Sequence, residues 1–500
     1  MTKILEQVNQ YLWGLPTLML IIGVGLFFSF GTRFIQISSL PKALARFFRQ
    51  FKSSERQETS SRKAVCTALA ATVGTGNVVG VAGAIALGGP GAVFWMWVCA
   101  FLGMVIKYAE ATLAVRFRQK DASGTYVGGP MFIIQKALPE RWSFLAGMYS
   151  FLGIVAALGV GNATQINAAI GAVHTLCGSF QVSMSRSQDV FLAFLIALVI
   201  MLCLKSGAGR IGTIAQYLVP MMSCIYILMG LGVIFFRVSD LPNVFQSIFV
   251  GAFNPSAVTA GAIGSAFISL RTGASRGIFT NEAGMGTAAI AHASSDVPHP
   301  CDQGLMGIVE VFADTIVICT ITALAILCSG VPVNYGNDPG GDLTIRAFSV
   351  VYGNWSEIVL SLCIILFAFA TVLGWGVYGG RCATFLFGEK AWNSFVVLQG
   401  AAVIAGTLLQ TGPVWLLSEI FNGLMAIPNL WMLILTSGEV FRLTKEYSFI
   451  HGRDSAAGGQ NENFNQCKPL RTFSYEKVSS SCSKGKGERK KDLSPEYRSA

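Results

Sequence analysis

The sequence predicts an all-α polytopic membrane protein with about 11 transmembrane helices. Hydrophobic residues make up 53% of the 500 residues and charged residues only 12%, whereas soluble domains carry about 25% charged residues. Apolar segments of about 20 residues, long enough to cross a hydrocarbon core of about 30 Å, recur along the chain. The 55 glycines fit this class, because small residues let transmembrane helices pack closely and break where a site is needed.

Eleven apolar segments are expected to cross the membrane. They lie near residues 14–32, 66–88, 91–116, 143–173, 189–206, 212–236, 260–290, 304–330, 354–376, 393–411 and 414–437. The segment 260–290 departs most from an apolar pattern, since it carries Arg271, Arg276 and Glu282. The first segment ends without an A-x-A site, so it is interpreted as a retained span and not as a cleavable signal peptide.

Basic residues are divided unevenly between the two sides that eleven spans create. Residues 33–65 and 116–141 place many Lys and Arg side chains on one side. Because cytoplasmic loops are enriched in Lys and Arg, we expect a plasma-membrane protein with its N-terminus outside and its C-terminus in the cytoplasm. The net charge of +10 is therefore interpreted as a topology signal and not as a nucleic-acid-binding surface. The lipid bilayer is the expected surrounding, and no sequence feature indicates a protein partner.

Six regions are predicted along the chain. They are an N-terminal peripheral transmembrane helix (1–33), a cytoplasmic amphipathic linker (34–65), a first five-helix repeat (66–236), an extracellular connector (237–259), a second five-helix repeat (260–437) and a basic, disordered cytoplasmic tail (438–500). Since each repeat has an odd number of spans, the second would be inverted relative to the first. A plain cytoplasmic connector is the alternative for the linker, whose Phe residues alternate with Lys and Arg.

Glycine-rich stretches interrupt the first span of each predicted repeat. They lie at 73–77 (Val-Gly-Thr-Gly-Asn) and at 272–277 (Thr-Gly-Ala-Ser-Arg-Gly). An unpaired backbone group in hydrocarbon costs several kcal/mol, so a break in mid-span needs a polar partner. The first break can offer carbonyls to a cation and N–H groups to a carboxylate, and paired breaks are typical of secondary transporters. A packing kink is the alternative, because glycine is common in transmembrane helices.

Long motifs follow both breaks. They are residues 75–97, 107–116, 128–131 and 276–286, with Ala291-His292, His299-Pro300 and Asp314-Thr315. Together they resemble the alanine or glycine:cation symporter family over roughly residues 10–440. The resemblance implies a sodium- or proton-coupled carrier of small neutral amino acids, with ten core helices in two inverted repeats and one extra N-terminal span. Residues 379–382 (Gly-Gly-Arg-Cys) depart from the family pattern at the inner end of the ninth span.

The resemblance also implies a substrate pocket formed by four core helices. Its residues would be Gly74, Thr75, Gly76 and Asn77 in the first break, Gln165 in the third core helix, Phe267 before the second break, and Thr371 and Trp375 in the eighth core helix. Gly74 and Gly76 would offer backbone groups, Gln165 would accept from the substrate ammonium, and Thr371 would supply a hydroxyl. Phe267 and Trp375 would wall off a methyl-sized side chain.

A sodium ion is expected between the first and eighth core helices. Its ligands would be the carbonyls of Ala70 and Val73 and the Thr371 hydroxyl, as the resemblance implies. The sequence shows no acidic residue beside the first break, which favours an oxygen-lined sodium site over a protonatable one. Na+ is therefore the expected coupling ion, and H+ is the alternative.

Charged residues inside spans are functional candidates by default. Lys107 and Glu110 lie three apart on one predicted helix and are interpreted as a structural pair. Arg276 and Glu282 are candidates for an inner gate, with a structural network at a helix end as the alternative. Asp314 is expected either to relay a proton or ion or to anchor a hydrogen bond between helices.

The breaks and the resemblance together predict sodium-coupled symport of a small neutral amino acid, alanine or glycine, by alternating access. Proton-coupled transport of the same substrates and a non-transporting amino-acid sensor are the alternatives. The chain is not expected to be an enzyme, because it has no Ser/His/Asp set or H-E-x-x-H motif in a pattern that supports catalysis.

Overall fold

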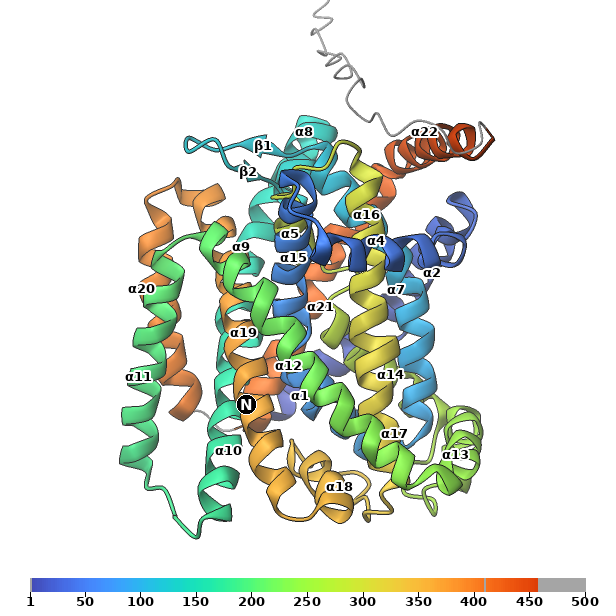
Figure 1. The fold of residues 1–500 in the computed structure, drawn as a ribbon, viewed down its shortest axis with the longest axis vertical. Coiled ribbons are helices and arrows are strands. Elements are labelled where there is room, and N and C mark those ends of the chain that lie inside the picture. Colours follow the sequence, from blue (N-terminus) through green and yellow to red (C-terminus); the bar gives the residue numbers. More distant parts are fainter. Residues whose placement is uncertain (1, 409–410, 457–500) are drawn as a thin grey trace, which may run out of the picture. The chain divides into compact units, whose positions relative to one another are not determined.

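The computed structural model describes residues 2–408 and 411–456. The chain divides into a main unit that ends at Phe449 and a second unit from Ile450, whose described part is the end of one helix. Helices dominate the main unit (Figure 1). Within the described residues, the strands are β1 (Gln119–Lys120) and β2 (Tyr126–Val127), which pair as an antiparallel hairpin.

The first part of the chain contains two N-terminal helices, two short helices and the helices of the first predicted repeat with its connector. They are α1 (Thr2–Leu12), α2 (Leu15–Gly31), α3 (Ile35–Ser38), α4 (Leu40–Lys52), α5 (Arg56–Thr72), α6 (Val79–Gly88), α7 (Gly91–Arg116), α8 (Pro130–Ala137), α9 (Phe144–Leu158), α10 (Thr164–Ser179), α11 (Arg186–Lys205), α12 (Ala208–Phe236) and α13 (Leu241–Phe253). A 3₁₀ turn (Thr75–Asn77) joins α5 to α6, and a π-helical turn (Gly159–Ala163) joins α9 to α10.

The second part contains the remaining helices. They are α14 (Ala266–Asn281), α15 (Thr287–His292), α16 (Pro300–Val311), α17 (Thr320–Cys328), α18 (Asp342–Tyr352), α19 (Trp355–Phe387), α20 (Ala391–Leu408), α21 (Thr411–Leu435) and α22 (Ser437–Ala456). A π-helical turn (Phe312–Cys319) joins α16 to α17. The predicted tail thus begins as a helix, and its residues 457–500 lie outside the described part of the chain.

Ten of the eleven predicted spans coincide with apolar helices. Eight helices are long and apolar enough to cross a membrane, or up to ten if each bent pair counts as one span, over the residues that the structure describes. The two bent pairs are Arg56–Thr72 with Thr75–Gly88, at 55°, and Glu419–Leu435 with Ser437–Ile450, at 60°. The segment 260–290 is not among them, since its main helix, α14, has only 16 residues and is polar.

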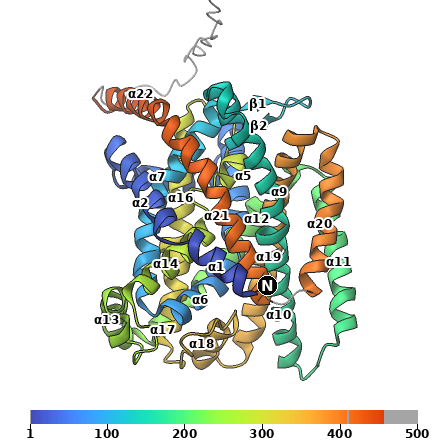
Figure 2. The ribbon, with the colours of Figure 1, turned by 180° about the vertical axis from the view of Figure 1, so that it is seen from behind.

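Helix α7 is a long and largely buried helix of the main unit. It packs against α14, α16, α2 and α13 (Figures 1 and 2), and most of its residues are buried, Lys107 and Glu110 included. Figure 2 shows the N-terminal helix α1 beside α21, which agrees with their contacts. Buried charged side chains need partners from neighbouring helices, because burying an unpaired charge is costly.

The second break is not where the sequence predicts it. Helix α14 runs without interruption through residues 272–277 and ends at Asn281. A Cβ at Gly273 would lie 2.3 Å from the Ala92 carbonyl oxygen, and one at Gly277 would lie 3.4 Å from Met96 Cα. Gly273 therefore serves close packing of α14 on α7, Gly277 leaves room for an ordinary contact, and neither glycine breaks the helix. The observed break is 282–286, where Glu282, Gly284 and Gly286 all have positive φ.

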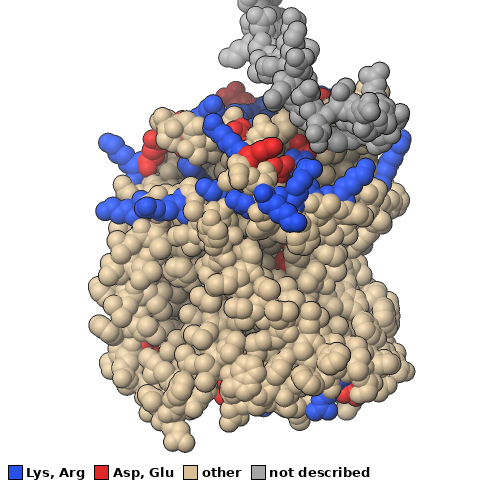
Figure 3. All heavy atoms as spheres, in the orientation of Figure 1, with Lys and Arg blue, Asp and Glu red and all other residues tan. Residues whose placement is uncertain are grey.

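Lys and Arg side chains gather at one end of the main unit. Figure 3 shows them near the end where Figure 1 places α4, α8, β1 and β2, and few appear at the opposite end in this view. We call the end that carries α4, α8 and the β1–β2 hairpin the basic end. In a membrane protein, such an asymmetry is a topology signal.

Candidate functional site

The first break leaves backbone groups of α5 and α6 free for other partners. Helix α5 ends at Thr72, and Gly74 is extended, with φ −137° and ψ −155°. The Gly74 N–H donates to Asn77 Oδ1 at 2.9 Å instead of continuing the helical ladder. The last carbonyls of α5, among them that of Ala70, therefore have no partner further along the same helix, and the Val73 carbonyl follows directly after it.

Gln165 reaches the first break from α10. Its Oε1 accepts hydrogen bonds from Thr75 Oγ1 at 2.8 Å and from the Thr75 N–H at 3.4 Å. Its Nε2 donates to the Val160 carbonyl at 3.2 Å, within the π-helical turn. Gln165 is buried, as are all four residues 74–77. A side-chain oxygen thus occupies donors that could equally bind a carboxylate.

Thr371 approaches the first break from α19. A Cβ at Gly74 would lie only 2.3 Å from Thr371 Oγ1, so glycine is needed at this contact. Helices α5 and α19 also lie close together one turn further along α19, because a Cβ at Gly374 would lie 2.8 Å from the Ala71 backbone nitrogen. The Thr371 hydroxyl is buried and makes no hydrogen bond in the structure. It is therefore an available oxygen beside the free carbonyls of α5.

Trp375 lies one turn after Thr371 on the same face of α19. It is 1% exposed and packs on the π-helical turn, where a Cβ at Gly161 would lie 2.2 Å from Trp375 Cβ. Its ring also contacts Tyr378, with centroids 5.7 Å apart. Packing on both sides holds the indole in one position. The role predicted for Trp375, a wall that limits substrate size, requires a side chain held in this way.

Phe267 does not belong to this group. It lies in the first turn of α14 and is 41% exposed. Since α14 is unbroken, Phe267 is separated from Phe279 by roughly 18 Å of helix. Phe279 takes the expected place, since its ring would lie 3.5 Å from a Cβ at Gly76 and its side chain is buried. The misplaced break explains this error, because a break at 272–277 would have put Phe267 one turn away from it.

An acidic residue does lie beside the first break, contrary to the sequence-based prediction. Asp314, in the π-helical turn between α16 and α17, accepts a hydrogen bond from Asn77 Nδ2 at 2.7 Å. Its other oxygen accepts from the Thr315 hydroxyl at 2.8 Å. Asp314 thus anchors a hydrogen bond between helices, which was one of the two roles expected for it. Asn77 and Asp314 are 237 positions apart in the sequence, so this contact cannot be predicted from local sequence patterns.

Lys107 pairs across helices and not within its own helix. Its Nζ lies 3.3 Å from Glu310 Oε1, and both side chains are fully buried. Glu310 Oε2 is also 2.8 Å from His292 Nε2. The intrahelical pair predicted with Glu110 is not the ion pair that forms, because Glu110 turns to the second break. The network joins α7, α15 and α16 close to the second break.

The second break is organised by the Glu110 carboxylate. Glu110 Oε1 accepts hydrogen bonds from the N–H groups of Gly284 and Gly286, both at 3.1 Å. The same oxygen accepts from Asn429 Nδ2 of α21 at 2.6 Å. One side chain therefore ties the backbone of the break to α7 and α21. The donors of the second break are thus bound by a carboxylate, whereas those of the first break are bound by the neutral side chains of Asn77 and Gln165.

Arg276 and Glu282 do not form a common gate with each other. Arg276 Nη2 lies 3.1 Å from Asp338 Oδ2 and 3.3 Å from Glu419 Oε1. Glu282 accepts a hydrogen bond from the Thr287 hydroxyl at 2.5 Å and interacts with the Trp375 indole. The two residues therefore belong to different networks, one toward the loop before α18 and one at the second break.

The sequence model described as the sodium:alanine symporter family matches residues 1–462. The chain belongs to this family. Sodium/alanine symporter AgcS of Methanococcus maripaludis is 37% identical over 91% of this chain and 98% of its own. An uncharacterized transporter of Haemophilus influenzae is 36% identical over 89% of this chain and 96% of its own. The probable sodium/glutamine symporter GlnT of Bacillus subtilis is 35% identical over 90% of this chain and 92% of its own.

The fold also matches that of a solved transporter. The crystal structure of MhsT in complex with L-phenylalanine superimposes with a TM-score of 0.53 and 14% identity, covering 78% of this chain and 97% of MhsT. At this identity the likeness shows the fold alone. The chain is thus an all-α, multi-pass cation-coupled amino-acid symporter of the sodium:alanine symporter family, and not an enzyme.

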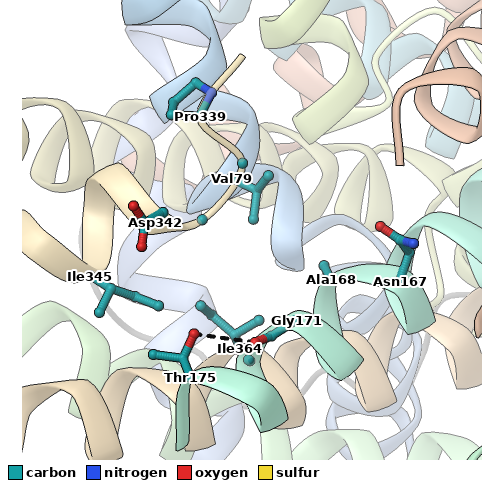
Figure 4. A pocket seen from close by; sticks show the side chains of 12 residues that line it. Val79, Asn167, Ala168, Gly171, Thr175, Pro339, Asp342, Ile345 and Ile364 are labelled. Carbon is teal, nitrogen blue, oxygen red and sulfur yellow. Dashed lines mark hydrogen bonds between the residues drawn. The ribbon is translucent and has the colours of Figure 1, made fainter. Parts of the chain in front are cut away.

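A cavity of about 220 Å³ lies beside the first break of this family member. Figure 4 shows its lining, which comes from α6, α10, α18 and α19 and from the loop before α18. Its residues include Val79, Asn167, Thr175, Asp342 and Ile364. Asn167 follows Gln165 on α10, so the cavity lies on the side of the candidate pocket away from the basic end.

Ion pairs tie helix ends together at the basic end. Arg381, where the sequence departs from the family pattern, lies 3.3 Å from Asp121 of the hairpin loop. Partial burial raises the pKa of Asp121, but hydrogen bonds from Ser123 and Thr125 and the Arg381 charge outweigh it, so this pKa lies below its usual range. These contacts join the end of α19 to the β1–β2 hairpin.

A second tie joins the ends of α7 and α21 through α22. Glu439 Oε1 accepts hydrogen bonds from Arg442 at 2.7 Å and from Arg116 at 2.8 Å. The hydrogen bonds from Arg442, with those from Arg116, lower the pKa of Glu439 to about 2. Glu439 therefore stays ionised at neutral pH and links α22 to the last residue of α7.

Proposed function

We propose that this protein is a sodium-coupled symporter of a small neutral amino acid, alanine or glycine, working by alternating access. The observation that carries the proposal is the first break, where backbone donors and acceptors meet the Gln165 amide and the Thr371 hydroxyl in a buried site. A zwitterion needs donors for its carboxylate and acceptors for its ammonium, and the break offers both.

The expected roles divide between the two ends of the substrate. The N–H groups of Thr75 and Gly76 would bind the carboxylate, displacing the Gln165 oxygen from Thr75. The Gln165 oxygen would then accept from the ammonium. Trp375 and Phe279 would enclose the side chain, and their fixed packing against Gly161 and Gly76 favours a small one.

The coupling ion is proposed to lie between α5 and α19. The Ala70 and Val73 carbonyls and the Thr371 hydroxyl are its candidate ligands, since the hydroxyl is buried without a hydrogen-bond partner. Oxygen ligands of this kind suit a hard monovalent cation. The names of AgcS and GlnT both include sodium, which supports Na+ as that cation.

The proposed topology follows from the basic end. Its Lys and Arg side chains (Figure 3) would face the cytoplasm of the plasma membrane, with the N-terminus outside. The proposed repeats remain 66–236 and 260–437, with 237–259 as the extracellular connector, although α5 begins earlier, at Arg56. On this topology the cavity beside α18 opens toward the outside, and Arg276 with Asp338 and Glu419 would close that side.

Uptake of labelled alanine into proteoliposomes tests the proposal. We expect accumulation against a concentration gradient when an inward Na+ gradient is imposed, and none when K+ replaces Na+. Gln165→Ala should abolish alanine binding while the protein still elutes as a folded particle on size exclusion. Undiminished uptake without Na+ at constant pH would show that the ion is wrong, and binding without accumulation would favour a sensor.

A further inference from the structure

The second break brings together more buried carboxylates than buried cations. Glu110 and Glu310 are 0% exposed and Glu282 is 2% exposed, and they surround Lys107, which is also 0% exposed. A buried ionised carboxylate is costly unless a positive charge or several hydrogen-bond donors compensate it. Lys107 neutralises one of the three carboxylates, so the group requires further cations or protons.

His292 does not supply a second positive charge. Gln50 Nε2 donates to the Ser61 hydroxyl at 3.0 Å, and that hydroxyl donates to Gln303 Oε1 at 2.7 Å. Gln303 Nε2 consequently donates to His292 Nδ1, at 2.7 Å. With the amides in these orientations, Nδ1 is an unprotonated acceptor, while Nε2–H donates to Glu310. This assignment from the hydrogen-bond network makes His292 neutral.

The three carboxylates differ in how well the protein stabilises their charge. Glu310 has Lys107 and the His292 N–H as partners. Glu110 has three N–H donors on one oxygen. Glu282 has the Thr287 hydroxyl, its interaction with the Trp375 indole and the charge of Lys107, which is already paired with Glu310. Glu282 is thus the carboxylate that is least stabilised as an anion, and the one that should hold a proton.

Unpartnered polar atoms around the break point to an exchangeable proton in the same place. The Tyr378 hydroxyl and Glu110 Oε2 are both buried and make no hydrogen bond. Tyr378 faces Glu282 and lies one turn after Trp375 on α19. Among the described residues, no group of three or more His, Cys, Asp or Glu side chains could hold a metal ion. A proton needs no set of ligands and can neutralise a single buried carboxylate.

We propose that Glu282 is a proton-binding residue of the transport cycle, protonated while the second break is closed around Glu110. When that side opens to water, the carboxyl O–H bond breaks, the proton leaves to water, and the carboxylate remains. Because Glu282 contacts Trp375, the charge change reaches the wall of the substrate pocket. The groups that face Glu282 are Lys107 of α7, Tyr149 of α9, Thr287 of α15, Glu310 of α16, and Trp375 and Tyr378 of α19. Glu110, His292 and Asp314 belong to the same network, because they interact with Lys107 or Glu310.

Infrared spectroscopy of the purified full-length protein tests the protonation directly. At neutral pH the wild type should show the C=O stretch of a buried protonated carboxyl. Glu282→Gln, whose amide oxygen can still accept from Thr287, should lose that band, and Glu110→Gln should keep it. An unchanged band in Glu282→Gln would overturn the proposal. Size exclusion and the thermal shift produced by alanine show whether each variant is folded.

Transport at fixed saturating Na+ gives a second readout, which rests on the proposed function. Across about pH 6 to 9, where buried carboxyls titrate, wild-type uptake should fall by up to about tenfold per pH unit once Glu282 loses its proton. Uptake by Glu282→Gln should change less than about twofold over the same range. If Glu282→Gln showed the same dependence of uptake on pH as the wild type, the proton assignment would be contradicted. It would also be contradicted if wild-type uptake changed with Na+ concentration at fixed pH in the same way as it changes with pH. If wild-type uptake showed no Na+ dependence, the proposed function would fail while the infrared result still stood.

Discussion

Replacing Gly74 with Ala should disrupt the first break through one contact. An added Cβ would lie 2.3 Å from Thr371 Oγ1, whereas the next atoms, Thr371 Cβ and Gln165 Oε1, would lie at 3.4 and 3.5 Å. Ordinary contact begins at 3.4 Å, so α5 and α19 would have to separate by about 1 Å. The extended backbone of Gly74 suits any residue, so the cost comes from the contact and not from backbone strain.

The size of the effect follows from the cost of overpacking. Inserting a methyl group into a well-packed site costs about 1–3 kcal/mol. If that cost falls on the state that binds substrate, alanine affinity should drop about 5- to 150-fold. Gly80→Ala is the matched control, because it lies on α6 and its added Cβ would meet nothing closer than 3.9 Å. We expect less than about twofold loss of affinity for Gly80→Ala.

Isothermal titration with alanine in saturating Na+ measures both variants, and a double-mutant cycle isolates the contact. Thr371→Ala removes the Oγ1 atom, so adding Gly74→Ala in that background should cost less than about 0.5 kcal/mol. The coupling between the two positions would then equal most of the overpacking cost. An equal loss of affinity in both backgrounds would refute the reasoning, since the clash with Thr371 could not then be its cause.

Three further perturbations test other contacts. Trp375→Phe should admit larger side chains, measured by competition of a panel of amino acids against labelled alanine, and unchanged selectivity would remove its role as a wall. Lys107→Met should destabilise the protein by about 3–5 kcal/mol in thermal unfolding, and adding Glu310→Gln should recover part of that loss, because it removes the uncompensated charge. Arg276→Gln should slow alanine exchange about tenfold or more while alanine affinity changes less than twofold, and equal effects on both would contradict a gating role.

Glycine patterns predicted the first break correctly and misplaced the second. Gly74 and Gly273 both allow close approach of another helix, but only Gly74 interrupts its own helix. The sequence cannot separate these uses, because both require the absence of a Cβ. A stronger signal lay further along the chain, where Gly284 and Gly286 follow Asn281 and Glu282 in positions that suit positive φ.

Contacts between distant segments could not be read from the sequence. The proximity of Gln165 to the first break was predicted only from the resemblance to a family. The contact between Asn77 and Asp314 was predicted neither from the residue patterns nor from the resemblance. The π-helical turn at 312–319 contributes to this, because it shifts side chains off the regular helical faces on which spacing arguments depend. Lys107 likewise forms its ion pair with Glu310 and not with Glu110, which is closer in the sequence. Glu110 instead accepts hydrogen bonds from the backbone N–H groups of the second break.

The two breaks differ in which groups accept hydrogen bonds from their backbone N–H groups. This difference indicates a different function for each break. At the first break, the acceptors are the neutral side chains of Asn77 and Gln165, which a substrate carboxylate can replace without leaving a buried charge unpaired. At the second break, the acceptor is Glu110, whose charge would be left without partners if its three donors were taken away. The first break can therefore exchange ligands in every cycle, whereas the second can open only if charge is redistributed around it. Loss of the proton proposed on Glu282 is the smallest change in the structure that would do so.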